Sequence, residues 1–490
     1  MKQMRGKGLG VSESGIAGLV GMAILLASVT TVYAGDLSLG DPRTMAFKPV
    51  EFSPPEPERV VLDNGMVLYL LEDHELPLVS ITATMRTGSW LDPTDKIGLA
   101  GMTGAVMRTG GGGGLSAEQV DAELEQFAAD VSIGIGRQSG AASLDVLSKD
   151  VKRGLEIFAG LIRTPAFDPA RVELVKLQAI EGIRRRQDNP GSIVGREFAK
   201  MLYGAAHPSA RESSLGSVTR ITRDDLVTFH HNTIHPNGMI LGVTGDFKRD
   251  EMVASLRTVF GNWKKGTVPE LRIVDVPEAE LSRPVIRFVG KETSQTHLRV
   301  GHLSIKENDS DYVALAIAND ILGGSSFRSR LFNDVRTKRG LAYSVGSRLN
   351  TGMHDQGVWL MRAETKLTST QEVIERFVAN IERIRAELVT DAELAEAKEA
   401  YVNSFVFSFA SPSAIVSRLV ELEYDGLPKD FLQQLRAKVV RLTKEDVLAA
   451  AKKHLRPDQL KIVAVGSGEA LPKALSTFGE VKEITLSPEG

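Results

Sequence analysis

Two stretches of the sequence resemble each other at a distance of 221 residues: Ile221-Thr222-Arg223-Asp224-Asp225-Leu226 and Leu442-Thr443-Lys444-Glu445-Asp446-Val447. The likeness continues without a gap to Pro236 and Pro457, and then to Gly245 and Gly466. In each copy the pattern predicts a capped helix, a turn that contains proline, and an apolar strand that ends at the glycine. Duplication at this length indicates two copies of one α/β domain rather than a solenoid of short repeats.

The repeat divides the chain into two halves that are joined by a linker. Residues 264–284 contain three prolines among charged side chains, which is typical of a connecting segment. We therefore expect an N-terminal domain over residues 59–263 and a C-terminal domain over residues 285–490. Before them, residues 35–58 carry five prolines and are expected to form an extended lead-in.

Local patterns predict several individual elements. Asn64-Gly65 between two apolar runs is a strong signal for a β-hairpin. The apolar pattern from Ser310 to Leu322 predicts a helix. Thr390 followed by Glu393 predicts a capping box at the start of another helix.

The N-terminus has the features of an export signal. Three of the first seven residues are basic, an apolar stretch follows from Gly15 to Val32, and Val32-Tyr33-Ala34 fits a cleavage site. These features predict a signal peptide over residues 1–34 and a mature protein that is periplasmic or secreted, with no membrane contact after cleavage. The alternative is an N-terminal membrane anchor, because the apolar stretch has close to the length that spans a bilayer.

The composition is that of an ordinary globular protein. Of the 490 residues, 42% are hydrophobic and 25% are charged, which argues against a disordered or fibrous chain. The 59 Lys and Arg residues face 62 Asp and Glu residues, so we expect no nucleic-acid partner. Cysteine is absent, which excludes a disulfide framework, a thiolate nucleophile and a cysteine-based metal site. The pattern Gly-x-Ser-x-Gly is absent too, so nothing supports a hydrolase with that nucleophile elbow.

One stretch of the C-terminal half places two polar side chains where they can meet: residues 327–345, FRSRLFNDVRTKRGLAYSV. The apolar face of residues 331–335 predicts a helix that Gly340 ends, and a strand begins after it. Arg336 at the helix end and Tyr343 at the strand start are then expected to converge. A guanidinium and a phenol together can donate hydrogen bonds to a peptide carbonyl or an oxyanion. The alternative is a surface arginine and a half-buried tyrosine with structural roles only.

The same stretch resembles the C-terminal-half signature of the insulinase/pitrilysin metallopeptidases, the inverzincins, in which S-R-L-F is followed by R-x-K-x-G-L-x-Y. Residues 98–100, 183–190 and 241–247 fit other segments of that family. The resemblance covers nearly all of the chain after the signal segment. It implies an α+β fold with two homologous α/β roll domains. It also implies that Arg336 and Tyr343 help to hold and polarise the scissile carbonyl.

The zinc motif of that family is missing. Inverzincins bind zinc through H-x-x-E-H on a helix and through a Glu much further along, and the Glu within the motif acts as general base. The matching positions hold Gly101, Gly104 and Ala105, and the distal Glu position falls on Gly182, one residue after Glu181. No side chain at these four positions can bind a metal. We therefore expect no metal and no cofactor in this chain.

Other candidate sites are weaker. His231 and His235 have a spacing that suits a helix-borne metal pair, but proline follows the second histidine and we assign them no metal role. Three further histidines are expected on strand surfaces: His74, His297 and His302. The run Gly110–Gly114 lacks the Lys and Ser/Thr of a phosphate-binding loop, so we interpret it as a flexible loop before a helix capped at Ser116.

These residues favour a protein that is not a peptidase by itself. The leading hypothesis is a non-catalytic subunit of an exported heteromeric zinc metallopeptidase. A homologous partner would carry H-x-x-E-H and the zinc, this chain would supply Arg336 and Tyr343, and the substrate would be a peptide or an unfolded protein. One alternative is a pseudoenzyme that binds peptides or scaffolds an assembly without proteolysis. The other is an enzyme with an unrecognised site, which would be active as a single chain.

Overall fold

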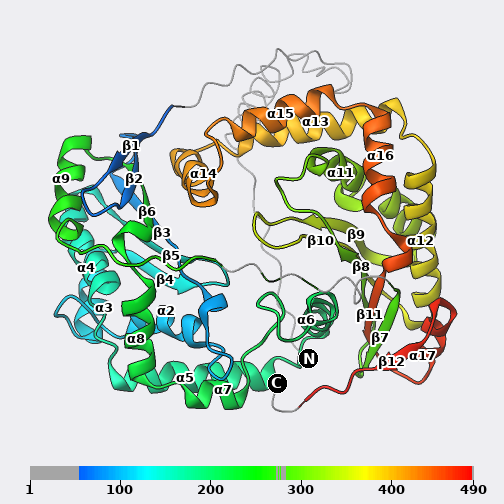
Figure 1. The fold of residues 1–490 in the computed structure, drawn as a ribbon, viewed down its shortest axis with the longest axis horizontal. Helices are drawn as coiled ribbons and strands as arrows, with labels where there is room; N and C mark the ends of the chain where they lie inside the picture. The colour runs from blue at the N-terminus through cyan, green and yellow to red at the C-terminus, as the bar shows by residue number, and fades with distance from the viewer. Residues whose placement is uncertain (1–54, 272–273, 275, 277–282, 488–490) are drawn as a thin grey trace, which may run out of the picture. The chain divides into compact units, whose positions relative to one another are not determined.

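The structure is a computed structural model (Figure 1), and it describes residues 55–271, 274, 276 and 283–487. The described residues belong to the second of two compact units, which spans Pro54–Gly490. The predicted signal peptide, most of the predicted lead-in and part of the predicted linker lie outside the described residues. Among the helices that are described, none is both long enough and apolar enough to cross a membrane.

The strands of the described chain form two six-stranded sheets that share the order of five strands and differ in the outermost one. The first sheet contains β1 (Glu58–Val61), β2 (Val67–Glu72), β3 (Leu78–Met85), β4 (Asp130–Ile135), β5 (Gly140–Leu147) and β6 (Met239–Gly245). The second contains β7 (Val285–Gly290), β8 (Thr296–Leu303), β9 (Ala342–Asn350), β10 (Val358–Thr365), β11 (Lys461–Gly466) and β12 (Val481–Glu483). Their orders are β1-β2-β6-β3-β5-β4 and β12-β7-β11-β8-β10-β9. The outermost strand is antiparallel to its neighbour in the first sheet (β1) and parallel to it in the second (β12).

The sequence repeat reappears as a structural repeat. The helices α8 (Arg223–Thr233) and α16 (Lys444–His454) both begin at a threonine that caps the helix reciprocally with an aspartate three residues later. Each is followed by a short 3-10 turn and by an interior strand, β6 or β11, that is parallel to one neighbour and antiparallel to the other. The predicted duplicated α+β fold is therefore confirmed.

Helices pack on both sheets and close two hydrophobic cores. Around the first sheet lie α2 (Leu99–Thr109), α3 (Ala117–Gln126), α4 (Val151–Arg163), α5 (Pro169–Arg185), α7 (Leu215–Arg220), α8 and α9 (Arg249–Phe260). Around the second lie α11 (Tyr312–Asn319), α12 (Thr370–Ala386), α13 (Asp391–Phe407), α15 (Phe431–Arg441), α16 and α17 (Ala470–Leu475). Fully buried residues such as Ile81 in the first core and Trp359 in the second come from alternating strand positions.

Two helices are exchanged between the halves. The helix α6 (Pro190–Tyr203) belongs to the first half of the sequence, yet Ile193 and Phe198 pack on Val463 of the second sheet. The helix α14 (Pro412–Asp425) belongs to the second half, yet Val416 and its neighbours pack on Tyr69 and other residues of the first sheet. The sequence did not predict this exchange, because each helix looks like an ordinary amphipathic element of its own half.

The local predictions hold with some differences. The hairpin at Asn64-Gly65 joins β1 and β2, and Gly65 adopts the left-handed conformation that such a turn requires. The helix predicted from Ser310 to Leu322 is split, because α11 ends at Asn319 and a π-helical turn, η4 (Asp320–Gly324), follows it. A second π-helical segment, η5 (Phe332–Lys338), lies in the motif that contains Arg336. Such segments are rare and are frequent at functional sites.

Candidate functional site

Arg336 and Tyr343 lie side by side, as their spacing predicts. Arg336 stands in the last turn of η5, which the Gly340 amide closes by donating to the Arg336 carbonyl at 3.0 Å. Gly340 has a φ of +63°, a left-handed conformation that glycine adopts without strain. The chain therefore reverses and enters β9 at Ala342, and this reversal brings the Tyr343 ring to 4.4 Å from the Arg336 guanidinium carbon.

Three aromatic rings surround the Arg336 guanidinium. Its central carbon lies 4.4 Å from the ring centre of Tyr343, 4.7 Å from that of Phe332 and 6.0 Å from that of Phe327. Phe327 and Phe332 also contact each other edge to face, with ring centres 4.9 Å apart. Stacking of this kind attracts the cation and restricts its rotation. We call these four residues the Arg336 cluster.

The Arg336 cluster is open to solvent and has free donors. Tyr343 is 77% exposed and Phe327 is 73% exposed, so the tyrosine is not half-buried as a purely structural role would predict. Within the described residues, neither the Arg336 guanidinium nor the Tyr343 hydroxyl has an ion-pair or hydrogen-bond partner. Both groups are thus available to donate to an oxygen of a bound molecule.

Two neighbouring arginines of the same motif, Arg330 and Arg339, form ion pairs instead. Arg330 donates two hydrogen bonds to Glu393, from Nε at 2.7 Å and from Nη2 at 2.8 Å. The Arg330 hydrogen bond is the main cause that lowers the pKa of Glu393 to about 2. Arg339 is paired with Asp334 at 3.1 Å. Arg336 differs from these two arginines, because its guanidinium stacks on aromatic rings and forms no ion pair within the described residues.

The positions that the resemblance assigns to zinc ligands do not fit a zinc ion. Gly101 and Gly182 are exposed, and a Cβ atom at either position would meet no heavy atom within 4 Å. A Cβ atom at Gly104 would lie 2.7 Å from the backbone nitrogen of Ile135 in β4, so no longer side chain fits there without a backbone shift. Ala105 offers a methyl group. These residues supply no ligand atom to a metal.

Glu181, the acidic residue next to the distal Glu position at Gly182, forms an ion pair within its own helix. The carboxylate of Glu181 accepts a hydrogen bond from Arg185 at 2.6 Å, one turn further along α5. This ion pair satisfies Glu181 on the outer surface of its own helix. Glu181 therefore does not substitute for the missing ligands.

The glycine run before α3 is not a free loop. The Gly113 amide donates to the Thr164 carbonyl at 3.2 Å, and the Gly111 carbonyl accepts from Ala166 at 2.9 Å. A Cβ atom at Gly113 would lie 3.0 Å from the Cα of Gly160 in α4, so the glycines let two backbones approach closely. The flexible-loop interpretation was wrong for this reason, whereas the predicted cap at Ser116 is confirmed.

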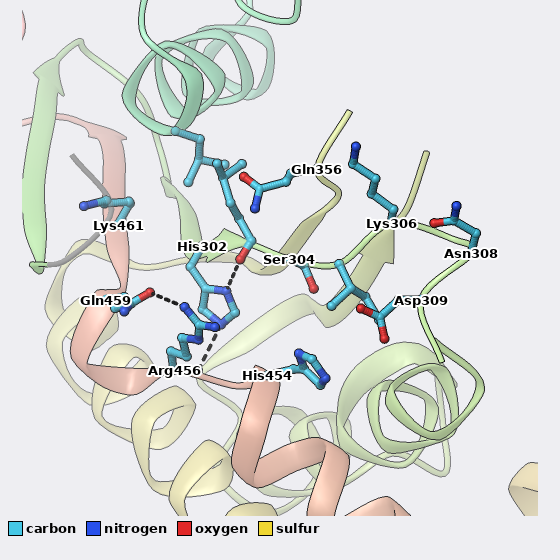
Figure 2. Close-up of a pocket in the computed structure, with 13 residues that line it drawn as sticks. His302, Ser304, Lys306, Asn308, Asp309, Gln356, His454, Arg456, Gln459 and Lys461 are labelled. Carbon is cyan, nitrogen blue, oxygen red and sulfur yellow. Dashed lines mark hydrogen bonds between the residues drawn. The ribbon is translucent and has the colours of Figure 1, made fainter. Parts of the chain in front are cut away.

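His302 is buried, which corrects the prediction that it lies on a strand surface. It is 3% exposed, its Nδ1 lies 2.8 Å from the Leu303 carbonyl, and its Nε2 accepts from the Arg456 amide at 3.1 Å (Figure 2). The ring also packs on Trp359 with 5.2 Å between centres. Burial lowers the pKa of His302 to about 4, so the imidazole is neutral at pH 7.

The other singled-out histidines are placed as follows. His74 is exposed directly after β2 and contacts Asp246 at 2.7 Å, and His297 is half-buried in β8. α8 ends at Thr233, so His235 lies beyond the helix and does not share a helix face with His231. The spacing of that pair therefore does not create a metal site.

A polar cavity of about 370 Å³ lies next to His302 (Figure 2). Asp309 and His454 on its wall come close to Asp311, and the three together have the side-chain types of a metal site. However, Asp311 already accepts from Lys453 at 2.6 Å and pairs with His454 Nε2 at 2.8 Å. An ammonium group at that distance satisfies the carboxylate and opposes a second cation, so we assign no metal to this cluster.

Two residues of the Arg336 cluster were missed as functional candidates. From the sequence pattern we assigned Phe332 to an apolar helix face and assigned Phe327 no role. Phe332 meets Arg336 because the two are four residues apart on one helical face, and Phe327 joins them through its edge-to-face contact with Phe332.

The chain is similar to known peptidase relatives. A family model described as "Peptidase M16 inactive domain" matches residues 220–401. The uncharacterized zinc protease YmxG of Bacillus subtilis is 25% identical over 366 residues, which cover 74% of this chain and 86% of that protein. The non-peptidase homolog YmxG of Helicobacter pylori is 24% identical over 409 residues, which cover 81% of this chain and 90% of that protein.

A solved structure extends the likeness to the fold. The crystal structure of a peptidase M16 inactive domain from Pseudomonas fluorescens matches with a TM-score of 0.73 and 28% identity, and it covers 84% of this chain and 98% of that chain. The family model, the relatives and the fold agree with the resemblance carried by residues 327–345. The chain is thus similar to the M16 peptidases, the insulinase/pitrilysin family, and its sequence lacks the H-x-x-E-H zinc motif.

Proposed function

We propose that this chain is the non-catalytic subunit of an exported heteromeric zinc metallopeptidase. The observation that carries the proposal is the free, aromatic-stacked guanidinium of Arg336 next to the free hydroxyl of Tyr343. In the assembled peptidase a homologous partner with H-x-x-E-H supplies the zinc and its activated water. This chain's Arg336 and Tyr343 donate hydrogen bonds to the carbonyl oxygen of the bound peptide, where negative charge develops.

The first half lacks the residues of a zinc site, whereas the second half keeps the Arg336 cluster, and this difference supports a role in a complex. The positions for zinc ligands offer no ligand atom, and the general-base position, Gly104, has no space for a longer side chain. The Arg336 cluster is complete and has no partner of its own in the described part of the chain. A chain that had lost all function would have no reason to keep a half-buried guanidinium, without an ion-pair partner among the described residues, fixed among three rings. The expected export signal places the complex in the periplasm or outside the cell.

The test is turnover by the mixture of this chain with an H-x-x-E-H homologue from the same organism. Tyr343→Phe keeps the ring that stacks on Arg336 and removes only the hydroxyl donor, so it isolates the hydrogen bond. Arg336→Lys keeps the charge and removes the forked donors. We expect each variant to lower kcat by about 10²-fold, the typical effect of removing one donor to an oxyanion.

The matched control is Arg339→Lys, in the same segment. Arg339 is engaged by Asp334, so this change should leave turnover unchanged. Unchanged turnover in both Arg336→Lys and Tyr343→Phe, with the complex intact on a sizing column, would refute the carbonyl-polarising role. Dissociation of the complex in these variants would instead indicate a docking role.

A second candidate is a pseudoenzyme that binds peptides or scaffolds an assembly without proteolysis. The exposure of Phe327 and Tyr343 favours this candidate, because exposed aromatic rings are typical binding anchors. It differs in one measurable respect: the variants would weaken peptide binding, while no mixture with any homologue would cleave the peptide.

A further inference from the structure

Three arginines gather on one face of the second sheet, on adjacent strands. Arg299 of β8 lies directly opposite Arg362 of β10 in the antiparallel register. Arg348 of β9 lies opposite Leu360, two residues from Arg362 on the same face, so it is the diagonal neighbour of Arg362. Gly346 stands directly opposite Arg362 and adds no side chain. We call Arg299, Arg348 and Arg362 the arginine face.

The arginine face has no anionic partner. Within the described residues, none of its three guanidinium groups forms an ion pair or a hydrogen bond. Like charges directly opposite in a sheet are destabilising, and burial together with the charge of Arg362 lowers the pKa of Arg299. A fold that keeps such a pair without compensation gains from a ligand of opposite charge.

Nearby carboxylates do not neutralise these arginines. Glu364 shares the face but lies 3.6 Å from the Nδ1 of His297. Asp320 lines the same cavity as Arg348 and Arg362, and burial raises the pKa of its carboxyl group. The face therefore keeps an excess of positive charge.

The arginine face opens into a cavity. Arg348 and Arg362, both exposed, line a cavity of about 570 Å³ beside Gly346 at the edge strand β9. No strand in the described chain pairs with the outer side of β9, which is the edge of this sheet. On the other side Arg299 is held under α6, where a Cβ atom at Gly195 would lie 3.3 Å from its Nη2. The arginines are thus partly fixed and reachable from solvent.

We propose that the arginine face binds the carboxylate side chains of an acidic peptide segment. Guanidinium groups match carboxylates with two parallel hydrogen bonds, and such charge-assisted bonds are the strong ones. A nucleic acid is not the occupant that the charge pattern favours, because the chain as a whole has no basic surplus. The inference rests on the proposed function in one respect, namely that the ligand is a peptide.

The distance between the arginine face and Tyr343 determines where the acidic residues would lie in a bound peptide. Arg348 and Tyr343 are five residues apart on β9, which corresponds to about 16 Å along a strand, and a register shift in the pairing with β10 leaves Tyr343 outside the regular alternation of faces. An extended peptide that touches both would carry its acidic side chains about five residues from the bond at Tyr343. Peptides of about twelve residues are therefore long enough to test the proposal.

The experiment measures binding to the purified chain alone by fluorescence anisotropy. The probes are a twelve-residue peptide with four Glu, the same peptide with four Gln, and a twelve-nucleotide single-stranded DNA. We expect the Glu peptide to bind about tenfold more tightly than the Gln peptide, with a preference that weakens as salt is raised. Equal affinity for the Glu and Gln peptides would overturn the proposal. Equally tight DNA binding that depends on the same arginines would also overturn it, because the face would then be a general anion surface.

Matched variants separate the arginine face from overall charge. R348Q/R362Q should abolish the preference for Glu, and R348K/R362K should keep only part of it, because the charges remain but the paired hydrogen bonds of the guanidinium groups are lost. R220Q/R257Q removes two exposed, unpaired arginines of the first half and should leave the preference unchanged. Loss of the preference in this control would contradict the proposal. Because no partner or zinc is present, a binding failure is distinct from a failure of the proposed peptidase role, which is read from turnover.

Discussion

Two glycines of one helix should respond in opposite ways to the same substitution. Gly101 and Gly104 are three residues apart in α2, at two of the positions that the family uses for zinc chemistry. The substitutions are Gly101→Ala and Gly104→Ala. At Gly101 the added methyl group meets nothing within 4 Å. At Gly104 it meets the backbone of β4, with Ile135 N at 2.7 Å and Gly134 C at 3.0 Å.

The expected magnitudes follow from two terms. Replacing glycine by alanine in a helix stabilises it by about 0.5–1 kcal/mol, and this term applies to both variants. Overpacking against a neighbouring element costs about 1–3 kcal/mol, and backbone atoms cannot rotate away as a side-chain end can. We therefore expect Gly101→Ala to be stabilising by about 0.5–1 kcal/mol and Gly104→Ala to be destabilising, with the two variants about 1–3 kcal/mol apart.

The assay is thermal unfolding of both variants beside the unchanged chain. A difference of 1–3 kcal/mol corresponds to roughly 2–12 °C in Tm for a half of this size. If Gly104→Ala is as stable as Gly101→Ala, α2 does not pack on β4 as closely as described, and a glutamate at position 104 would be sterically possible. The expected result instead means that restoring H-x-x-E-H by substitution damages the fold.

Three further predictions concern stability. Glu393→Gln should lower the free energy of unfolding by about 2 kcal/mol at pH 7, a value reduced for partial exposure, because Arg330 loses its partner. The pKa of Glu393 falls from 4.5 to about 2 on folding, so this loss of stability should shrink as the pH drops below 4.5. A loss that does not depend on pH would contradict this cause. His302→Asn should flatten the pH dependence of the free energy of unfolding between pH 6.5 and 4. The neutral His302 stabilises fully above pH 6.5, and this contribution is lost as the pH falls toward 4. Identical curves of unfolding free energy against pH for the variant and the unchanged chain would refute the burial effect. Thr222→Ala and Thr443→Ala should each cost about 1 kcal/mol in denaturant unfolding, and clearly unequal costs would show that the two caps are not equivalent.

The sequence predicted the elements that local chemistry determines. The hairpin at Asn64-Gly65 and the cap at Thr390 are confirmed, because turn and cap residues satisfy their own backbone neighbours. The exchange of α6 and α14 could not be predicted. An amphipathic pattern shows that a helix has an apolar face, but it does not identify the sheet on which that face packs.

The candidate site was predicted only where chain reversal sets the geometry. The meeting of Arg336 and Tyr343 follows from one helix end and one strand start. The burial of His302 was missed although alternation along β8 indicates it, because His302 lies on the same face as the buried Leu298 and Val300. On that face the backbone amide of Arg456 and the ring of Trp359 replace solvent around the imidazole. The alignment of the arginine face required the register between strands that are distant in sequence, which no local pattern contains.

The most direct test of the central claim measures zinc content and peptidase activity on the same samples. The purified mature chain is assayed alone, then together with an H-x-x-E-H homologue from the same organism, and that homologue is assayed alone. The account predicts no stoichiometric zinc and no cleavage by this chain alone, and cleavage by the mixture that exceeds that of the homologue. Cleavage with one zinc per molecule by the single chain would contradict the absence of a zinc site, and no gain on mixing would contradict the subunit role.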